Sequence, residues 1–304
     1  MTILKKLITY IFVLLLSFSC SKKKKKLQIV CTTTMIADMA RQIAGDKCEI
    51  IGLMNAGVDP HAYKATSKDI SYLHSADIIF HNGLHLEGKM SDALKNYGKS
   101  GKHCYAVSAK IPKEKLLFDE NIGEDSVDPH IWVDPDLWIE CVKYVTEILV
   151  KVDSKNASFY KEREKKYLEE LADLKKYLNE EFSKIPDDKR ILISAHDAFS
   201  YFGKCFNMKI IGLQGISTVS ECGMKDIESM IEFINKNKVK AIFLETSVPE
   251  SSIMSVVEGC KRRGFEIKIG GHLYSDALGE ANKEEGTYIG MMKHNASVIV
   301  SSLI

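Results

Sequence analysis

The sequence predicts an α/β protein of two lobes, each with a mostly parallel four-stranded sheet flanked by helices, joined by one long connecting helix. The chain has 304 residues, enough for two domains of about 150 residues each. Strand-like and helix-like segments alternate twice along it, a pattern typical of parallel sheets with right-handed crossovers. A single long segment of helical period separates the two series. We expect a first lobe over 27–152, a connecting helix over 153–186 and a second lobe over 187–304.

The first residues are typical of a secretory signal peptide, which we place at 1–19. Lys5 and Lys6 form a positive region, and the apolar stretch Leu7–Ser19 follows it. This stretch is too short to cross a bilayer as a helix and suits the apolar part of a signal peptide.

Cys20 comes next, after a small residue, as in the box that directs acylation of bacterial lipoproteins. Ser17 stands where the usual pattern has leucine, so a plain cleaved signal is the alternative. The lysine run Lys22–Lys26 would hold the folded domain away from a membrane. We therefore expect lipidation of Cys20 and a lipid-anchored lysine tether over 20–26.

Charge and cysteine content exclude several classes of protein. The formal net charge is +1, but the first 26 residues contain seven lysines and no acidic residue. The remaining chain is therefore acidic, with a charge of about −6, and lacks the basic surface that nucleic acids require. The eight cysteines include no Cys-x-x-Cys pair, which argues against a thiolate zinc knuckle and a dense disulfide framework.

The expected elements of the first lobe begin with a β-branched run and alternate from there. A helical pattern after the first strand stops at Gly45, because glycine is favoured just beyond a helix end. We expect strands at 27–34, 48–54, 77–81 and 103–108, and helices over 35–44, 66–75 and 136–150.

The connecting helix is expected over Ser154–Ile185, about 48 Å at 1.5 Å per residue. Ser154 is a suitable N-cap and Pro186 ends the segment. A coiled-coil arm is the alternative, but the mixed aromatic and aliphatic stripe favours packing against the protein's own lobes. The stripe consists of Tyr160, Tyr167, Leu171, Leu174, Leu178, Phe182 and Ile185.

The second lobe repeats the alternation of strand and helix. We expect strands at 190–195, 208–214, 241–246 and 265–270, with helices over 223–237, 250–262 and 286–302.

Polar residues that follow the predicted strands indicate a binding site, because ligands of open α/β sheets bind beyond the carboxyl ends of strands. The tripeptide Asp-Pro-His occurs in two such loops and brings in His61 and His130. His196 and Asp276 follow strands of the second lobe. Three imidazoles and one carboxylate suit zinc, manganese or iron, although single histidines are often structural.

Six separated motifs give further support to the interpretation as a metal site. Their order and spacing resemble those of the zinc/manganese receptors of bacterial ABC importers, the TroA-like group, over nearly all of residues 27–304. This resemblance implies the two-lobed fold with one long helix, and one divalent metal ion per chain held by His61, His130, His196 and Asp276. The motifs are Asp59-Pro60-His61, Ile79–Glu87, Asp128–Trp132, Ala195–Phe199, Gly212–Thr218 and Ser275-Asp276.

The resemblance also bears on which metal is bound. Manganese-dedicated members tend to have glutamate at the third ligand position, where this chain has His196. Zinc-dedicated members often have a histidine-rich loop before the second Asp-Pro-His, and residues 109–127 contain no histidine. We therefore predict a site that accepts both zinc and manganese, with zinc bound more tightly.

Several nearby residues are rivals or supports for these four ligands. His272 is close to Asp276 in sequence and is the main rival, and Asp276 itself could instead cap the turn that follows. Glu245 is a plausible cleft residue without an assigned role. His81 and His85 are interpreted as structural. The acids Asp59, Asp128 and Asp197 could orient imidazoles or cap helices, and are not included among the ligands.

The resemblance implies an exported, membrane-anchored, monomeric receptor at the periplasmic or cell-surface face, which delivers its metal to an ABC permease. It implies neither catalysis nor nucleic-acid binding. Two alternatives belong to other classes of protein. One is a surface adhesin or antigen in which metal is incidental, and the other is an envelope zinc hydrolase, which would need an open coordination position.

Overall fold

The protein is described by a computed structural model that covers residues 26–118, 127–220 and 222–304. The expected signal peptide, Cys20 and the first lysines of the tether lie outside these residues. Within the described ranges, no helix is both long enough and apolar enough to cross a membrane.

The first lobe is built on a parallel four-stranded sheet with strand order β2-β1-β3-β4. Its four strands all fall in the predicted segments. The short helix α4 was not expected, since its nine residues carry only one fully buried apolar side chain, Leu94. The elements are β1 (Leu27–Cys31), α2 (Thr34–Ala44), β2 (Cys48–Gly52), α3 (Ser67–Ser75), β3 (Ile78–His81), α4 (Ser91–Lys99), β4 (Cys104–Ala106) and α5 (Pro135–Val152).

Local sequence fixes the ends of these helices. Thr33 accepts a hydrogen bond from the Ile36 amide at the start of α2, and Gly45 ends that helix at φ 52°, where a side chain would be strained. Thr66 and Asp69 form a reciprocal capping box on α3. These ends turn the chain back toward the sheet at the predicted points.

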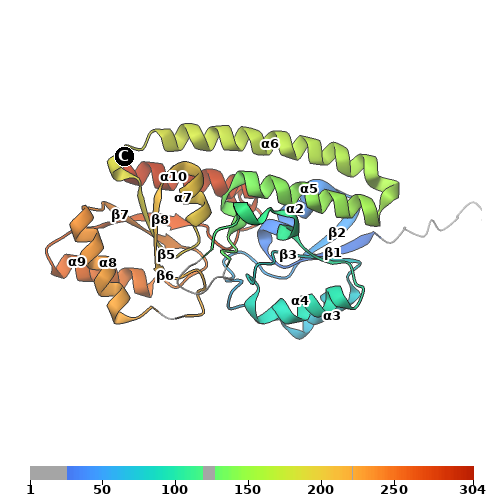
Figure 1. Cartoon of the computed structure of the whole chain (residues 1–304), viewed down its shortest axis with the longest axis horizontal. Coiled ribbons are helices and arrows are strands. Elements are labelled where there is room, and N and C mark those ends of the chain that lie inside the picture. The colour runs from blue at the N-terminus through green and yellow to red at the C-terminus, as the bar shows by residue number, and fades with distance from the viewer. Residues whose placement is uncertain (1–25, 119–126, 221) are drawn as a thin grey trace, which may run out of the picture.

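The long helix α6 (Ala157–Ser183) extends over both lobes, with α2, α5, α7 and α10 between it and the sheets (Figure 1). Its predicted apolar stripe is confirmed, because all of those side chains, Tyr160 to Ile185, are buried. The predicted N-cap is wrong. Residues Ser154–Asn156 form a separate 3-10 turn, and Asn156 precedes α6 without a side-chain cap. The helix is therefore about 40 Å long.

The second lobe contains two parallel strand pairs, β5-β6 and β7-β8. Strands β5 and β7 lie side by side, but in the described part of the lobe no backbone ladder joins them into the single four-stranded sheet that was expected. A side chain bridges their ends instead, since Glu245 accepts a hydrogen bond from the His196 amide. The elements are β5 (Ile191–His196), α7 (Ser200–Phe206), β6 (Lys209–Gln214), α8 (Met224–Asn237), β7 (Ala241–Glu245), α9 (Ser251–Arg262), β8 (Lys268–Leu273) and α10 (Tyr288–Leu303).

Strand β8 begins three residues later than the predicted strand at 265–270. The Phe265 amide still bonds to the carbonyl of Cys260 and closes the end of α9, and the Phe265 side chain packs on the core of this lobe. The strand can start only after that turn. As a consequence His272 lies within β8, not in the loop after it.

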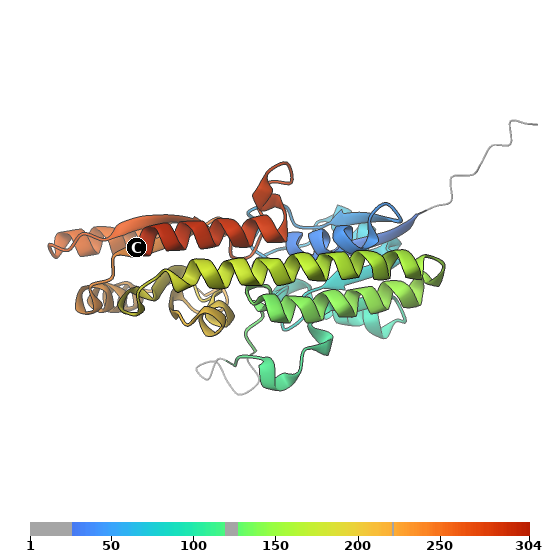
Figure 2. The same ribbon diagram turned by 90° about the horizontal axis from the view of Figure 1, so that it is seen from above.

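A single apolar core runs through both lobes beneath α6. It includes side chains from α2, α5, α6, α7 and α10, and from strands of both lobes. Seen from above, α6 lies beside α5 over one lobe and beside α10 over the other (Figure 2). Two smaller cores fill the opposite faces of the sheets, one in each lobe. The shared core allows less relative motion of the lobes than a flexible linker would.

Candidate metal site

Four side chains from separate loops and strand ends meet between the lobes. His61 follows β2, His130 precedes a short 3-10 turn at Ile131–Val133, His196 ends β5, and Asp276 follows β8. One donor atom from each lies within 4.8 Å of the others. All four residues are at most 4% exposed. The structure thus brings together the four residues that the sequence singled out.

Three of the distances between donor atoms are those of neighbouring ligands around one small ion. The Nε2 atoms of His61 and His130 are 3.2 Å apart. The Asp276 carboxylate oxygens lie 3.5 Å from His130 Nε2 and 3.3 Å from His196 Nε2. Zinc–nitrogen bonds of about 2.0–2.1 Å place tetrahedral ligands about 3.3–3.4 Å apart. These three contacts therefore have the spacing of neighbouring ligands in a four-coordinate transition-metal site.

The polar atoms of this cluster also lack sufficient partners within the protein. Both carboxylate oxygens of Asp276 and the Nε2 of His196 are buried without a hydrogen bond from any described residue. Buried polar atoms are nearly always satisfied, because leaving one unpaired costs about 1–3 kcal/mol. A bound cation would satisfy these atoms together, so the donor set fits a metal ion.

Two residues in the loop of the second Asp-Pro-His, Asp128 and Trp132, contact the ring of His130. Asp128 Oδ1 accepts the His130 amide at 2.9 Å and lies 2.7 Å from its Nδ1. A carboxylate at Nδ1 favours the tautomer that leaves Nε2 free to bind metal. Trp132 stacks edgewise on the imidazole and donates from Nε1 to the Ser275 carbonyl at 2.7 Å, next to Asp276. This contact links the loop of His130 in one lobe to the loop of Asp276 in the other.

Glu245, which the sequence left without an assigned role, lies behind His196 and holds it in place. Its Oε2 lies 2.7 Å from His196 Nδ1, and its Oε1 accepts the His196 amide at 2.8 Å. Gly212 of β6 leaves room for this arrangement, since a Cβ there would lie 2.5 Å from the Asp197 nitrogen and 2.7 Å from the His196 carbonyl carbon. The backbone on either side of the His196 peptide therefore requires glycine at that position.

His61 is held differently from the other two histidines. Asp59 Oδ1 accepts the His61 amide at 2.8 Å, the turn expected of Asp two residues ahead. However, no described side chain hydrogen-bonds to the His61 Nδ1. Among the three imidazoles, His61 depends most on the position of its loop.

Burial and neighbouring charges set the protonation of the site. Burial lowers the pKa of His61 to about 4, so its ring is neutral at pH 7. Burial also lowers the pKa of His130, but the Asp128 and Asp276 carboxylates outweigh it and raise that pKa to about 9. Glu245 and Asp276 likewise outweigh burial and raise the pKa of His196. Burial raises the pKa of Asp276, but His196 and His130 bring it well below its usual range.

The other residues that the sequence placed near the predicted site are not members of the cluster. His272 is exposed on β8, and its Nε2 is 2.9 Å from Glu250. His81 lies 3.9 Å from the buried Glu87, and His85 is exposed. Asp197 accepts a hydrogen bond from the Ser200 hydroxyl.

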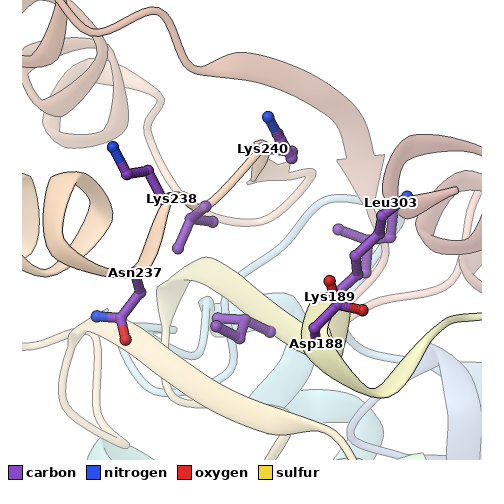
Figure 3. A pocket seen from close by; sticks show the side chains of 8 residues that line it. Asp188, Lys189, Asn237, Lys238, Lys240 and Leu303 are labelled. Atoms are coloured by element: carbon purple, nitrogen blue, oxygen red, sulfur yellow. The ribbon is translucent and has the colours of Figure 1, made fainter.

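A surface hollow at the opposite end of the second lobe is separate from this cluster (Figure 3). It is lined by residues at the start of β5 and β7 and at the ends of α8 and α10, including Lys189, Lys238 and Lys240. The metal cluster lies at the other, carboxyl ends of those strands and is filled by its own side chains.

Most of the chain matches one protein family and is similar in sequence to known proteins. Residues 29–302 match the family ZnuA, described as the periplasmic component A of a zinc-uptake complex. The chain is 43% identical to the manganese-binding lipoprotein MntA of Bacillus subtilis (strain 168), over 92% of this chain and 90% of that protein. It is 39% identical to the zinc-binding protein TroA of Treponema pallidum (strain Nichols), over 90% and 88%.

Solved structures agree with the sequence matches. The periplasmic zinc-binding protein TroA of Treponema pallidum superposes with a TM-score of 0.88, covering 91% of this chain and 99% of that chain at 39% identity. The Fe(III)-bound YtgA of Chlamydia trachomatis superposes with a TM-score of 0.81, covering 91% and 98% at 25% identity.

Proposed function

The chain belongs to the ZnuA family of periplasmic zinc-uptake components, and from this premise we propose that it is the metal-capturing receptor of an ABC importer. Its substrate is one divalent transition-metal ion, bound between the lobes and passed to a membrane permease. The observation that carries this proposal is the buried three-histidine, one-aspartate cluster, whose donor atoms lie within 4.8 Å of one another and include unsatisfied ones.

We propose His61, His130, His196 and Asp276 as the ligands. The first two come from the first lobe, over 27–152, and the other two from the second lobe, over 187–304. Binding of an ion by all four therefore joins the lobes, and release requires at least one pair of ligands to move away. We propose that docking on the permease moves that pair of ligands away from the ion.

Zinc and manganese are both accepted by this donor set. Imidazole nitrogens suit zinc, and the three donor-atom distances of 3.2–3.5 Å match the spacing of neighbouring ligands around it. The two free oxygens of Asp276 allow bidentate binding, which suits the higher coordination number of manganese. Zinc is expected to bind more tightly, because affinity rises from manganese to zinc along the first-row divalent series.

MntA is named a manganese-binding lipoprotein, and the relative SsaB of Streptococcus sanguinis is named a metal ABC transporter substrate-binding lipoprotein. We propose an extracytoplasmic, lipid-anchored placement for this chain through Cys20. We also propose that the chain is a monomer without enzymatic activity. Four protein donors close a tetrahedral site, whereas catalytic zinc keeps a position open for water.

The test is a titration of the metal-stripped protein with zinc and with manganese. We expect one equivalent of either ion, lost or much weakened in His196→Ala, because that variant removes a donor atom. His272→Ala is the matched control, since His272 is an exposed histidine of the same lobe with no contact to the cluster. Absence of stoichiometric binding, or equal losses in both variants, would contradict the receptor function.

A further inference from the structure

The two Asp-Pro-His motifs are identical in sequence but make different contacts. Asp128 uses one carboxylate oxygen for both the amide and the ring of its own histidine. Asp59 uses Oδ1 for the His61 amide and turns Oδ2 away from the imidazole. That second oxygen accepts a hydrogen bond from the Thr218 hydroxyl at 2.6 Å.

The bond between Thr218 and Asp59 crosses from one lobe to the other. Thr218 lies in the loop between β6 and α8 of the second lobe, and Asp59 lies in the loop after β2 of the first. Both side chains are partly exposed. The Trp132–Ser275 contact also crosses between the lobes, but it is buried next to the shared core. The Thr218–Asp59 bond is therefore an interlobe contact that can open without disturbing that core.

This contact connects the second lobe to the ligand that is least constrained otherwise. The His130 and His196 rings each have a carboxylate within 2.7 Å of Nδ1. His61 has no such partner among the described residues, so its ring position follows from the backbone of its loop. That backbone is bonded to Asp59, and Asp59 is bonded in turn to Thr218.

We propose that Thr218 is a positioning residue for metal retention, whose hydroxyl holds Asp59, and through it His61, in the closed site. This inference rests on the proposed function, since it concerns the same ion. Thr218 does not touch the metal cluster. It acts by keeping the His61 loop against the second lobe, so that its loss speeds release of the ion but leaves all four ligands in place.

The effect should be moderate. A hydrogen bond to a charged acceptor contributes more than a neutral one, but water can replace it at partly exposed side chains. We expect zinc to dissociate about three to ten times faster without the Thr218 hydroxyl, with little change in the association rate.

The first test measures zinc release into excess chelator by stopped flow. Thr218→Val keeps the side-chain shape and removes the hydroxyl, whereas Thr218→Ser retains the hydroxyl and should restore slow release. Ser217→Ala is the matched control, because among the described residues the Ser217 hydroxyl bonds within its own loop, where it accepts from the Val219 amide. Release from Thr218→Val within twofold of the unmodified protein, or equal acceleration in Ser217→Ala, would overturn the proposal.

The second test needs no metal and separates this inference from the proposed function. Amide hydrogen exchange of the metal-free protein should be about three to ten times faster at residues 57–63 in Thr218→Val, while residues 128–132 exchange at an unchanged rate. If the protein binds no zinc, the receptor function fails and this comparison alone decides the positioning role. Unchanged exchange at 57–63 refutes it in either case.

Discussion

Replacing Glu245 by glutamine tests whether a carboxylate behind His196 tunes the metal site. Glu245 contacts two donors on His196, the backbone amide and the ring Nδ1, at 2.8 and 2.7 Å. A glutamine has one oxygen and one NH2 group, so it can accept from only one of them. If its oxygen stays on the amide, the NH2 group faces Nδ1 and favours the tautomer with a proton on Nε2. That proton occupies the atom needed by the metal.

The magnitude follows from the contact that is lost. Loss of a partner behind a metal-ligating histidine typically weakens metal affinity by about ten- to a hundredfold. We therefore expect Glu245→Gln to raise the Kd for zinc by about ten- to a hundredfold, with an unchanged stoichiometry of one.

The assay is competition for zinc against a chelator of known affinity at pH 7. Glu250→Gln is the control, because Glu250 also pairs with a histidine, His272, but on the exposed surface. It should leave the Kd unchanged. A Kd for Glu245→Gln within threefold of the unmodified protein, or a similar loss in Glu250→Gln, would refute the reasoning.

Three further predictions concern protons, stability and the connecting helix. In the metal-free closed site the neighbouring carboxylates outweigh burial and raise the pKa of His130 to about 9, and they also raise the pKa of His196, whereas burial lowers the pKa of His61 to about 4. Zinc binding at pH 7 should therefore release about one to two protons per ion, measured with a pH indicator in weak buffer. The affinity for zinc should also fall from pH 7.5 to 5.5. Binding without proton release would contradict this prediction. Zinc at a thousandfold excess over Kd should stabilise the fold by about 4 kcal/mol in urea unfolding, and a gain of the same size in His196→Ala would place the ion elsewhere. Leu171→Ala, at a fully buried position of α6, should cost about 2–5 kcal/mol of unfolding free energy, and a cost below 1 kcal/mol would show that the stripe does not anchor the helix.

Much of the fold was predictable because its signals are local and periodic. The apolar stripe of α6 and the glycine after α2 mark those elements directly in the sequence. The start of β8 was not predictable, because Phe265 has the pattern of a strand residue while its amide completes the preceding helix. Helix α7 was missed because seven residues are too few for a helical period to emerge from a loop.

The four residues of the cluster were predictable because each lies at or beyond the carboxyl end of a predicted strand, where the loops of parallel sheets converge. Their supports were harder to identify. The Asp of each Asp-Pro-His is a turn residue in sequence, and only the structure distinguishes Asp128, which reaches its imidazole, from Asp59, which reaches Thr218. Glu245 ends a buried strand, and its contact with His196 depends on β5 and β7 lying side by side.

The most direct test of the account is an anomalous-diffraction experiment on crystals of the zinc-loaded protein, recorded at the zinc edge. We predict a single strong peak between the lobes, bonded to the Nε2 atoms of His61, His130 and His196 and to the carboxylate of Asp276 at about 2.0–2.2 Å. A peak at another place, or an ion there with solvent in place of one of these four side chains, would contradict the central claim.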